Sequence, residues 1–541
     1  MTNMTCKTAT PVQTGKTVVE NTILSAMLLT DGYKLGHRLM YPSNMTKLYS
    51  NLTPRGKKYL PEATEGAVVF GIQYYIKKYL IKDFNECFFN LPEEVVVEHY
   101  RSLLTSYLGK ETADMIGVDH IRDLHRLGYL PIRIKALPEG TYCPIGVPML
   151  TITNTHPKFA WLTNYLESLT SNVLWHPVTA ATMADVFKRE LIRHAMKTGF
   201  YNPDDTSNID FLCHDFSMRG MSSLESSIVS GMAFLTSFSG SECVPAIKSL
   251  ELYYNADPSK QIVAATVPAS EHSVECTNAF YGNDSDTPDD EIYFKRMLET
   301  FKSGIISIVA DGYDYWHFIT KIVPKYKDEI MARNGRVVIR PDSGDPVKII
   351  CGDAEAEDPF VKIGSYEFLW NTFGGTFNEK GYKVLDTHIG LLYGDSINMK
   401  RQRETYRQLE NKMFAGTNLV LGIGSFSMGM VSRDSLAQAM KATYFELDEN
   451  PNGKAIFKDP KTVTGTPKKS HKGLLQVKWS GELQEYYVKD QCTHKEEENS
   501  CLETVFENGV LCKEYTLESI REIRRILAHA AVVKQINTPA V

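Results

Sequence analysis

The sequence predicts an α/β protein that contains a parallel sheet or a βα barrel. After Asp210, short apolar runs alternate with helical stretches, as they do in βα units. Most of these apolar runs end in polar or glycine-rich residues. A third observation is that alternating, hairpin-like segments precede this region and further strand-like segments follow it. Because parallel strands end at one rim, the polar segments are expected to lie together.

Length and composition limit the class of protein. The chain has 541 residues, of which 43% are hydrophobic and 23% charged, as is typical of a globular protein with a large core. A net charge of −6 argues against a nucleic-acid-binding protein. Ten scattered cysteines without a CxxC pair indicate neither zinc nor redox chemistry and favour the reducing cytosol. Residues 1–20 are polar, and no apolar run approaches the ~20 residues of a membrane helix, so we expect a cytoplasmic protein without a membrane segment.

The first part of the chain predicts mixed structure. Residues 1–20 are expected to form a loose tail. Residues 48–53 predict a strand that ends in a basic turn at Arg55, and residues 67–80 predict a helix. Residues 130–155 alternate between apolar and polar side chains and predict antiparallel hairpins. Two helices are expected over residues 158–174 and 181–197.

The middle part predicts the repeated βα units. Helical stretches are expected over residues 222–238, 287–302, 313–333 and 396–413. The candidate strands are Phe211–Phe216, Ile262–Thr266, Ile305–Asp311, Val337–Asp342, Ile389–Tyr393 and Leu419–Gly424.

The ends of these strands predict the functional site. The stretch 336–346 runs from an apolar strand into Arg340, Asp342, Ser343 and Gly344, and so presents a cation, a carboxylate and a close backbone together. Similar polar ends follow the other strands, at residues 214–220, 270–273, 311–314, 394–396 and 422–425. Glycine turns offer N–H groups to phosphate, and carboxylates suit ribose hydroxyls or Mg²⁺. The expected rim is therefore typical of a site for a phosphorylated sugar.

After residue 434 the alternation fades. Strands are expected at Ala439–Phe445, Tyr486–Val488 and Thr504–Val510, with a helix near Leu517–Ala530 and a turn at Asn450–Gly453.

Taken together, these segments resemble the nicotinamide phosphoribosyltransferase family over residues 23–525. The resemblance rests on segments that occur in the family's order: residues 30–34, 214–220, 267–273, 339–344, 394–395, 422–425, 432–434 and 457–460. It implies a pentosyltransferase with a fold like that of the type II phosphoribosyltransferases, an irregular βα barrel joined to a mixed α/β domain that both chain ends build. We expect the barrel over residues 176–433 and the mixed domain over residues 21–175 together with 434–541.

The resemblance also implies the substrates and the site residues. The family transfers phosphoribose from phosphoribosyl pyrophosphate to nicotinamide for NAD salvage, as a homodimer with active sites shared between subunits. Nicotinamide would stack between Phe216 and Tyr33, and Arg340 and Glu242 would contact it. The phosphoribosyl pyrophosphate site is implied to comprise Arg219, Asp342, Gly394, Asp395, Gly424, Ser425, Arg433, Arg55, Lys441 and Lys458.

Catalysis is implied to involve His272, Arg340 and Asp342. His272 matches the family histidine that ATP phosphorylates, and an imidazole with one free nitrogen is a competent nucleophile. ATP is therefore an expected co-substrate, and Mg²⁺ an expected cofactor whose ligands the sequence does not define. Glu271 is a candidate for orienting the histidine.

The chain departs from the family at two positions. Where the family generally has an aspartate that accepts hydrogen bonds from the nicotinamide amide, this chain has Glu242. An anion at this position favours an amide over a carboxylate, so we expect a preference for nicotinamide. The glycine-rich turn has Ser425 and Phe426 after Gly424, in place of further glycines.

Two other functions are open at this stage. A nicotinate phosphoribosyltransferase would share the fold and the chemistry, and the anionic Glu242 argues against it. A catalytically silent signalling or interaction protein could use the same scaffold, although it would not need the full set of Arg, Asp and His side chains.

Overall fold

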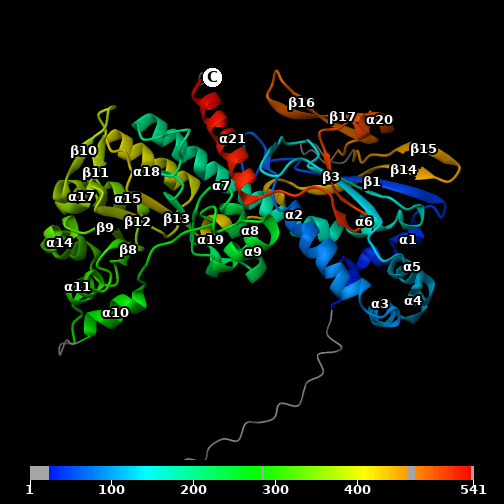
Figure 1. Ribbon diagram of the computed structural model, residues 1–541, viewed down its shortest axis with the longest axis horizontal. Coiled ribbons are helices and arrows are strands. Elements are labelled where there is room, and N and C mark those ends of the chain that lie inside the picture. The colour runs from blue at the N-terminus through cyan, green and yellow to red at the C-terminus, as the bar shows by residue number, and fades with distance from the viewer. Residues whose placement is uncertain (1–23, 282–285, 461–468, 538–541) are drawn as a thin grey trace, which may run out of the picture.

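The computed structural model describes residues 24–281, 286–460 and 469–537. A barrel forms one end of the molecule and a mostly antiparallel sheet the other, with helices α7 (Glu167–Thr198) and α21 (Leu517–Asn537) between them (Figure 1). The tail expected at residues 1–20 lies outside the described residues.

Six parallel strands form the wall of the barrel in the order β7-β6-β13-β12-β9-β8. Strand β12 (Ile389–Tyr393) consists of five consecutive buried residues, as expected of a parallel strand that is covered on both faces. The other strands are β6 (Cys213–Asp215), β7 (Gly240–Ser241), β8 (Gly304–Val309), β9 (Gly335–Arg340) and β13 (Leu419–Ile423). The predicted irregular βα barrel is thereby confirmed.

An irregular segment closes the barrel between β7 and β8. Ala265 bridges Gly240, and Ala269 bridges Ser307, both in parallel fashion. The strand predicted at Ile262–Thr266 is wrong as a regular strand, because the segment changes partners within four residues. Pro268 lies between the two bridges and has no N–H to donate to a ladder.

Helices surround the barrel in the expected alternation, although several are shorter than predicted. The helix expected over residues 313–333 is broken into α12 (Tyr315–His317), a π-helical turn η8 (Phe318–Ile322), α13 (Val323–Lys325) and α14 (Lys327–Met331). Pro324 explains this break, since a proline removes one helical hydrogen bond and clashes with the preceding turn. The remaining elements of this part are α8 (Leu224–Phe234), α9 (Val244–Tyr254), α10 (His272–Phe280), α11 (Asp290–Thr300), α15 (Pro346–Cys351), α16 (Pro359–Ile363), α17 (Ser365–Phe373), α18 (Met399–Asn411), α19 (Ser425–Met428) and the hairpin β10 (Gly375–Phe377)–β11 (Lys383–Leu385).

Both chain ends contribute to the second sheet, which has the strand order β15-β14-β1-β5-β3-β18-β19. Strand β1 (Met45–Thr53) pairs antiparallel with β5 (Leu150–Asn154) on one side and with β14 (Ala439–Leu447) on the other. The expected turn at Asn450–Gly453 is instead the start of β15 (Asn450–Ala455), which pairs with β14. The other strands are β3 (Ile132–Ala136), β18 (Glu503–Glu507) and β19 (Val510–Leu511).

Smaller elements cover this sheet. The segment predicted as one helix over residues 67–80 starts instead with a short strand, β2 (Ala67–Val68), which pairs with β4 (Tyr142–Cys143). The other elements are α1 (His37–Met40), α2 (Ile72–Tyr75), η4 (Ile76–Asp83), η5 (Asn85–Phe89), α3 (Glu93–Leu108), α4 (Lys110–Ile116), α5 (Asp119–Leu127), α6 (Leu162–Tyr165), β16 (Leu474–Ser480), β17 (Glu485–Cys492) and α20 (His494–Glu498).

Helix α7 is longer than either of the two helices predicted in its place. It continues through Pro177, and a methyl group on Gly71 would meet the Pro177 ring at 2.6 Å, so the proline is held by tight packing that outweighs its effect on the helix. The expected domain boundary at residue 175 falls inside this helix, and the division into two domains stays a prediction.

Helix α21 is fixed to α7 by a buried ion pair between Arg524 and Asp185, and Arg524 also donates to Gly140 O at 2.8 Å. A buried pair of this kind is costly to break because one charge is then left unpaired. Over the described ranges, no helix combines the length and the apolar character needed to cross a membrane.

Candidate functional site

The carboxyl ends of the barrel strands bring the predicted rim residues together. Phe216 and Arg219 follow β6, Glu242 follows β7, His272 follows the closing segment, Arg340 ends β9 and Asp342 follows it, Gly394 and Asp395 follow β12, and Gly424 and Ser425 follow β13. All of these strands are parallel neighbours, so the residues share one rim.

His272 begins α10 and contacts a carboxylate from the next strand. Its Nε2 lies 3.1 Å from Oδ1 of Asp311, which follows β8 and is nearly buried. The other oxygen of Asp311 accepts the backbone N–H of Asp342 at 2.9 Å. Asp311 therefore joins His272 to the turn that carries Asp342, and Nδ1 of the imidazole has no hydrogen bond among the described residues.

Arg340 and the carboxylates around it form the charged part of the rim. Arg340 Nη2 donates to Ser270 O at 2.6 Å, while its Nε is buried and has no partner among the described residues. Burial raises the pKa of Asp342, Asp311 and Asp395 raise it further, and Arg340 and His272 oppose the shift. The site thus holds several carboxylates close enough to repel one another, and a cation or a hydroxyl-rich ligand would relieve that repulsion.

Phe216 lies flat against two glycines of the rim. A methyl group on Gly422 would lie 2.4 Å from Cδ2 of Phe216, and one on Gly394 would lie 2.8 Å from it. The Phe216 ring fits here because neither glycine has a side chain that would clash with it. The half-buried ring offers a stacking surface for a flat heteroaromatic molecule.

The turn after β13 lies against the turn after β6. A methyl group on Gly220 would lie 2.0 Å from Oγ of Ser425, so the Ser425 hydroxyl sits directly beside the turn that carries Arg219. Arg219 is exposed and has room to turn toward an anion at the start of α19.

Glu242 borders a cavity of about 580 Å³ inside the barrel, which Phe216 and Arg340 also line. Thr266 Oγ1 donates to Oε1 of Glu242 at 2.5 Å, and Nε2 of His214 lies 3.5 Å from the same oxygen. Burial lowers the pKa of His214 to about 4, so this imidazole is neutral at pH 7. Glu242 therefore presents an anionic acceptor next to the Phe216 ring, in a cavity with mostly apolar walls.

The remaining predicted residues form a second group on the antiparallel sheet side. Tyr33 is 62% exposed and shares a cavity of about 520 Å³ with Arg433. Burial lowers the pKa of Lys441, and Arg55, Lys458 and Arg433 lower it further, while Glu167 opposes the shift. These four cations are thus close enough to repel one another, as in an anion-binding surface.

Several members of the two groups lie far apart within one chain. β9 and β12 lie in the barrel, whereas β1 and β14, which lead to Arg55 and contain Lys441, lie at the opposite end of the molecule (Figure 1). Within the described ranges, no hydrogen bond or ion pair joins a residue of one group to a residue of the other.

Comparison with known proteins places the chain in a family. Residues 211–510 match the model of the nicotinate phosphoribosyltransferase (NAPRTase) family, and residues 25–134 match the nicotinamide phosphoribosyltransferase N-terminal domain. The chain is 42% identical over 502 residues to the nicotinamide phosphoribosyltransferase of Acinetobacter baylyi, an alignment that covers 91% of this chain and 95% of that protein. The chain belongs to the nicotinamide phosphoribosyltransferase family. Proteins with the same name from Mycoplasma pneumoniae (33% identity, 78% of this chain and 90% of that protein) and Xanthomonas campestris (30%, 92% and 97%) are also similar.

The structure adds residues to the set that the family resemblance implied. The partner of His272 is Asp311, whereas Glu271, the candidate named from sequence, accepts a hydrogen bond from Ser273. Thr266 and His214 join Glu242. Asp311 belongs to the strand end 311–314 that the sequence placed at the rim, since it follows an apolar strand, whereas the Thr266 contact depends on the path of an irregular loop.

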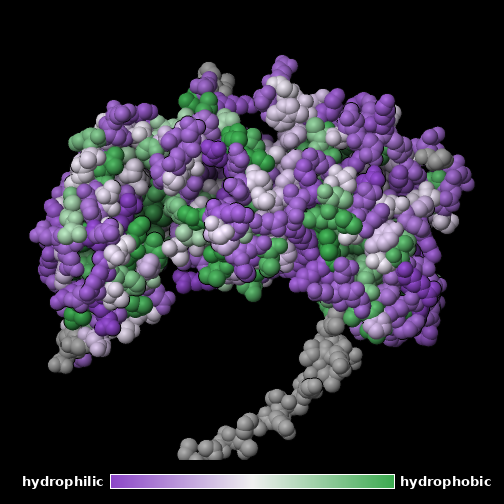
Figure 2. Space-filling view, in the orientation of Figure 1, coloured by the Kyte–Doolittle hydropathy of each residue, from purple (hydrophilic) through white to green (hydrophobic). Residues whose placement is uncertain are grey.

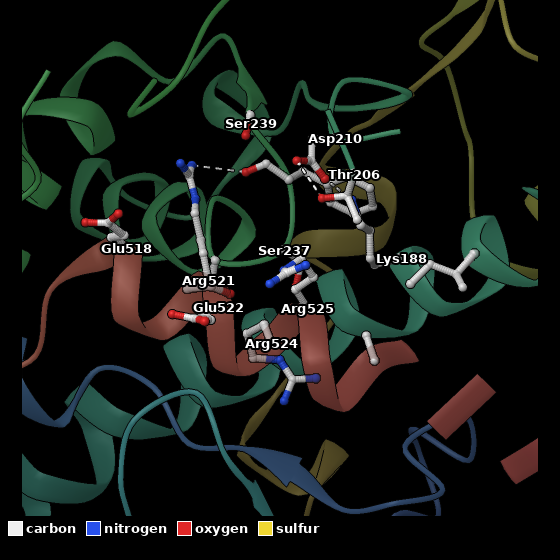
Figure 3. A pocket seen from close by; sticks show the side chains of 14 residues that line it. Lys188, Thr206, Asp210, Ser237, Ser239, Glu518, Arg521, Glu522, Arg524 and Arg525 are labelled. Carbon is white, nitrogen blue, oxygen red and sulfur yellow. Dashed lines mark hydrogen bonds and ion pairs between the residues drawn. The ribbon is translucent and has the colours of Figure 1, made fainter. Parts of the chain in front are cut away.

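A further polar cavity, of about 300 Å³, lies where α21 meets the barrel (Figure 3). Arg521 extends from α21 and donates to four carbonyl oxygens, those of Leu235, Phe238, Ile262 and Val263. Lys188 pairs with Asp210 at 2.5 Å. Because Arg521 and Lys188 already have partners within the chain, we interpret this cavity as part of the polar contact that holds α21 to the barrel, and not as an anion-binding site.

The described residues contain no cluster of three or more His, Cys, Asp or Glu side chains with the geometry to hold a metal ion. The pair of Asp342 and Asp395 nevertheless suits Mg²⁺, which keeps several waters and commonly binds through one or two carboxylates and the phosphates of a substrate.

Proposed function

We propose that the protein is a nicotinamide phosphoribosyltransferase, a pentosyltransferase that joins nicotinamide to phosphoribosyl pyrophosphate and releases nicotinamide mononucleotide and pyrophosphate. Membership of the family supports this proposal. The observation that carries it is the barrel cavity, which is lined by Phe216, Glu242 and Arg340 together.

The reaction fits the residues of the rim. The N1 lone pair of nicotinamide forms a bond to C1 of the ribose while the bond from C1 to the pyrophosphate oxygen breaks. The pyridine nitrogen is already nucleophilic, so no general base is needed, and catalysis rests on positioning and electrostatic stabilisation. Phe216 holds the ring by stacking, Asp342 and Asp395 bind ribose hydroxyls or the metal ion, and Arg219, Gly424 and Ser425 face the phosphates.

Mg²⁺ would bind at Asp342 and Asp395 and would neutralise charge on the departing pyrophosphate. The raised pKa of Asp342, to which the neighbouring carboxylates contribute, supports this assignment, since a bound cation removes their repulsion.

ATP would act through His272. The contact between Nε2 and Asp311 favours the tautomer whose Nδ1 lone pair is free to attack a γ-phosphoryl group. In that step the Nδ1–P bond forms and the bond from the γ-phosphorus to the ADP oxygen breaks. The aspartate would stabilise the positive imidazole that results.

A homodimer would complete each site with the second group of residues from its partner. Tyr33 would stack on the outer face of nicotinamide, and Arg55, Arg433, Lys441 and Lys458 would surround the pyrophosphate. Exposed apolar side chains on and beside α8 and α9 offer a contact surface for such a dimer: Leu224, Val244, Leu252 and Met430. Hydrophobic residues gather at the lower edge of the molecule in Figure 2, where α8 and α9 lie in Figure 1, as is common at interaction surfaces.

The preference between nicotinamide and nicotinate would depend on Glu242. Its carboxylate accepts a hydrogen bond from an amide N–H and repels the carboxylate of nicotinate. A side-by-side assay with both acceptors, phosphoribosyl pyrophosphate and Mg²⁺, with and without ATP, tests the proposal. We expect nicotinamide mononucleotide as the main product and faster formation with ATP.

Other outcomes of this assay have defined meanings. A nicotinate product would reassign the acceptor. Failure to release pyrophosphate with either acceptor would indicate a catalytically silent protein on the same scaffold. As a transferase, the enzyme would serve NAD salvage in the cytoplasm.

A further inference from the structure

Glu275 lies one helical turn after His272 on α10 and is fully buried. Neither of its carboxylate oxygens has a hydrogen-bond partner among the described residues. An ionised carboxylate in such a place is costly, because burial removes its hydration and nothing replaces it. Glu275 thus places an ionisable side chain on the face of α10 that packs against the protein interior.

The carboxyl group packs directly on the turn that carries Asp311. A methyl group on Gly312 would lie 2.5 Å from Oε2 of Glu275 and 2.6 Å from its Cδ. Only a glycine fits at this point, so the backbone that follows Asp311 and the side chain of Glu275 share one small space. A change at Glu275 therefore acts on the segment that positions Asp311 and, through it, His272.

Burial and the carboxylates around Glu275 oppose its ionisation. Asp290 and Tyr293 face it from α11, Asp311 and Tyr313 from the turn after β8, and Arg340 from the end of β9. Burial, Asp290 and Asp311 raise the pKa of Glu275 to about 8, whereas Arg340 lowers it. The Gly312 amide also opposes the shift, although it does not reach hydrogen-bonding geometry.

We propose that Glu275 is a positioning residue for His272 and Asp311 that acts as a neutral carboxylic acid, and that its ionisation disrupts the rim. This inference rests on the proposed function for its effect on turnover. With Glu275 neutral, the Asp311 carboxylate is free of a second adjacent charge and holds both His272 and the backbone of Asp342. With Glu275 ionised, the two carboxylates repel each other, and Arg340 gains an internal partner that competes with the substrate.

The first experiment measures the proton itself and needs no substrate. Glutamate labelled with ¹³C at the side-chain carboxyl is incorporated into the full chain, and its NMR signals are followed from about pH 6 to about pH 10. Burial raises the pKa of Glu139 to about 7 and that of Glu275 to about 8, so we expect two glutamates to titrate far above the usual range and only the signal near 8 to be absent in Glu275→Gln. If Glu275→Gln removes no glutamate signal that titrates near 8, the inference is wrong.

The second experiment compares pH profiles of kcat/KM for nicotinamide with saturating ATP. For a group with a pKa near 8 that must be protonated, kcat/KM of the wild type falls about tenfold between pH 7 and pH 9. Glu275→Gln is neutral at every pH and should lack this fall while it keeps activity at pH 7. Glu299→Gln, an exposed glutamate at the end of α11, is the matched control and should keep the wild-type profile.

Parallel profiles for the wild type and Glu275→Gln would overturn the positioning role, because a purely structural contact would not remove a pH dependence. The two experiments also separate this inference from the proposed function. A wild type that titrates near 8 but makes no nicotinamide mononucleotide would contradict the function alone. An active wild type without such a titration would contradict the role of Glu275 alone.

Discussion

The imidazole Nε2 of His272 lies 3.1 Å from Oδ1 of Asp311. The two residues are 39 positions apart and come from different βα units, yet they meet at one rim. Asp311 also accepts the Asp342 backbone N–H, so a single carboxylate connects the proposed phosphate acceptor with the ribose-binding turn.

Replacing Asp311 with asparagine should uncouple ATP from transfer. The amide keeps the shape but removes the charge that stabilises a positive imidazole, so we expect nicotinamide-stimulated ATP hydrolysis to fall about hundredfold. Transfer measured without ATP should fall much less. Phosphate release and nicotinamide mononucleotide formation are measured in parallel.

The matched control is Asp386→Asn. Asp386 pairs with His388 through Oδ1 and Nδ1 at 2.7 Å, but this pair precedes β12 and lies at the opposite end of the barrel. The Asp386→Asn variant should hydrolyse ATP at a rate within about twofold of the wild type. Equal losses in both variants would contradict a special role for Asp311.

Arg340 should contribute strongly to the transition state. A charged donor aimed at developing negative charge is worth about 3 kcal/mol, so Arg340→Ala should lower kcat/KM at least about hundredfold. Arg336→Lys changes the other end of the same strand, where Nε donates to Thr387 O, and should have a small effect. Retention of activity by Arg340→Ala, with a circular dichroism spectrum like that of the wild type, would refute the assignment.

The parts of the fold that the sequence predicts well are those with strong local patterns. β12 was expected at Ile389–Tyr393 and is found there, because four hydrophobic residues and Gly390 lie between Thr387-His388 and Gly394. β7 was missed, since Gly240 and Ser241 have no apolar pattern and are placed by their neighbours in the barrel. The gap between the helices predicted over residues 158–174 and 181–197 was wrong, because α7 continues through Pro177, where packing against Gly71 outweighs the local preference.

The candidate site likewise contains residues that the sequence predicts and residues that it does not. The rim followed from polar residues at strand ends, which topology alone brings together. The role of Glu275 could not be predicted, because a glutamate in a helix is normally expected to face solvent. The contact of Thr266 with Glu242 depends on two irregular loops, and neither has a periodic pattern.

The ionised side chain of Asp342 should lower the free energy of unfolding when no ligand is bound. Its pKa is raised in the folded protein, so its ionisation disfavours folding. The cost is absent at acidic pH and appears as pH rises through the pKa of the unfolded chain. Asp342→Asn should therefore raise Tm at pH 7, and the gain should disappear as the pH falls towards 4. Asp345→Asn, whose amide still caps α15, should leave Tm nearly unchanged; a lower Tm for Asp342→Asn would contradict this reasoning.

Arg521 should hold α21 to the barrel. Arg521→Met leaves four carbonyl oxygens without their donor, and we expect a loss of about 3 kcal/mol in the free energy of unfolding. Arg525, on the same helix, donates only to Pro203 O in the described structure, so Arg525→Met should cost about 1 kcal/mol or less. Denaturant unfolding of both variants measures the two losses in the free energy of unfolding. Similar losses would argue that Arg521 has no special role in holding α21 to the barrel.

Shared active sites can be tested by mixing two inactive variants. Asp342→Ala removes a rim residue, and Arg433→Ala removes a residue of the second group, so each homodimer should be inactive if each site draws on both subunits. After denaturation and refolding of an equal mixture, half of the dimers contain one copy of each variant. One of the two sites in such a dimer has both defects and the other has neither, so activity should recover to about a quarter of the wild type. A mixture that stays inactive, although the wild type recovers after the same treatment, would mean that Arg433 and Asp342 serve a site within one chain. The physical basis of the expected recovery is the placement of the two residues in the fold, since Asp342 follows β9 in the barrel whereas Arg433 lies in the short turn Arg433–Ser435, which packs against α7.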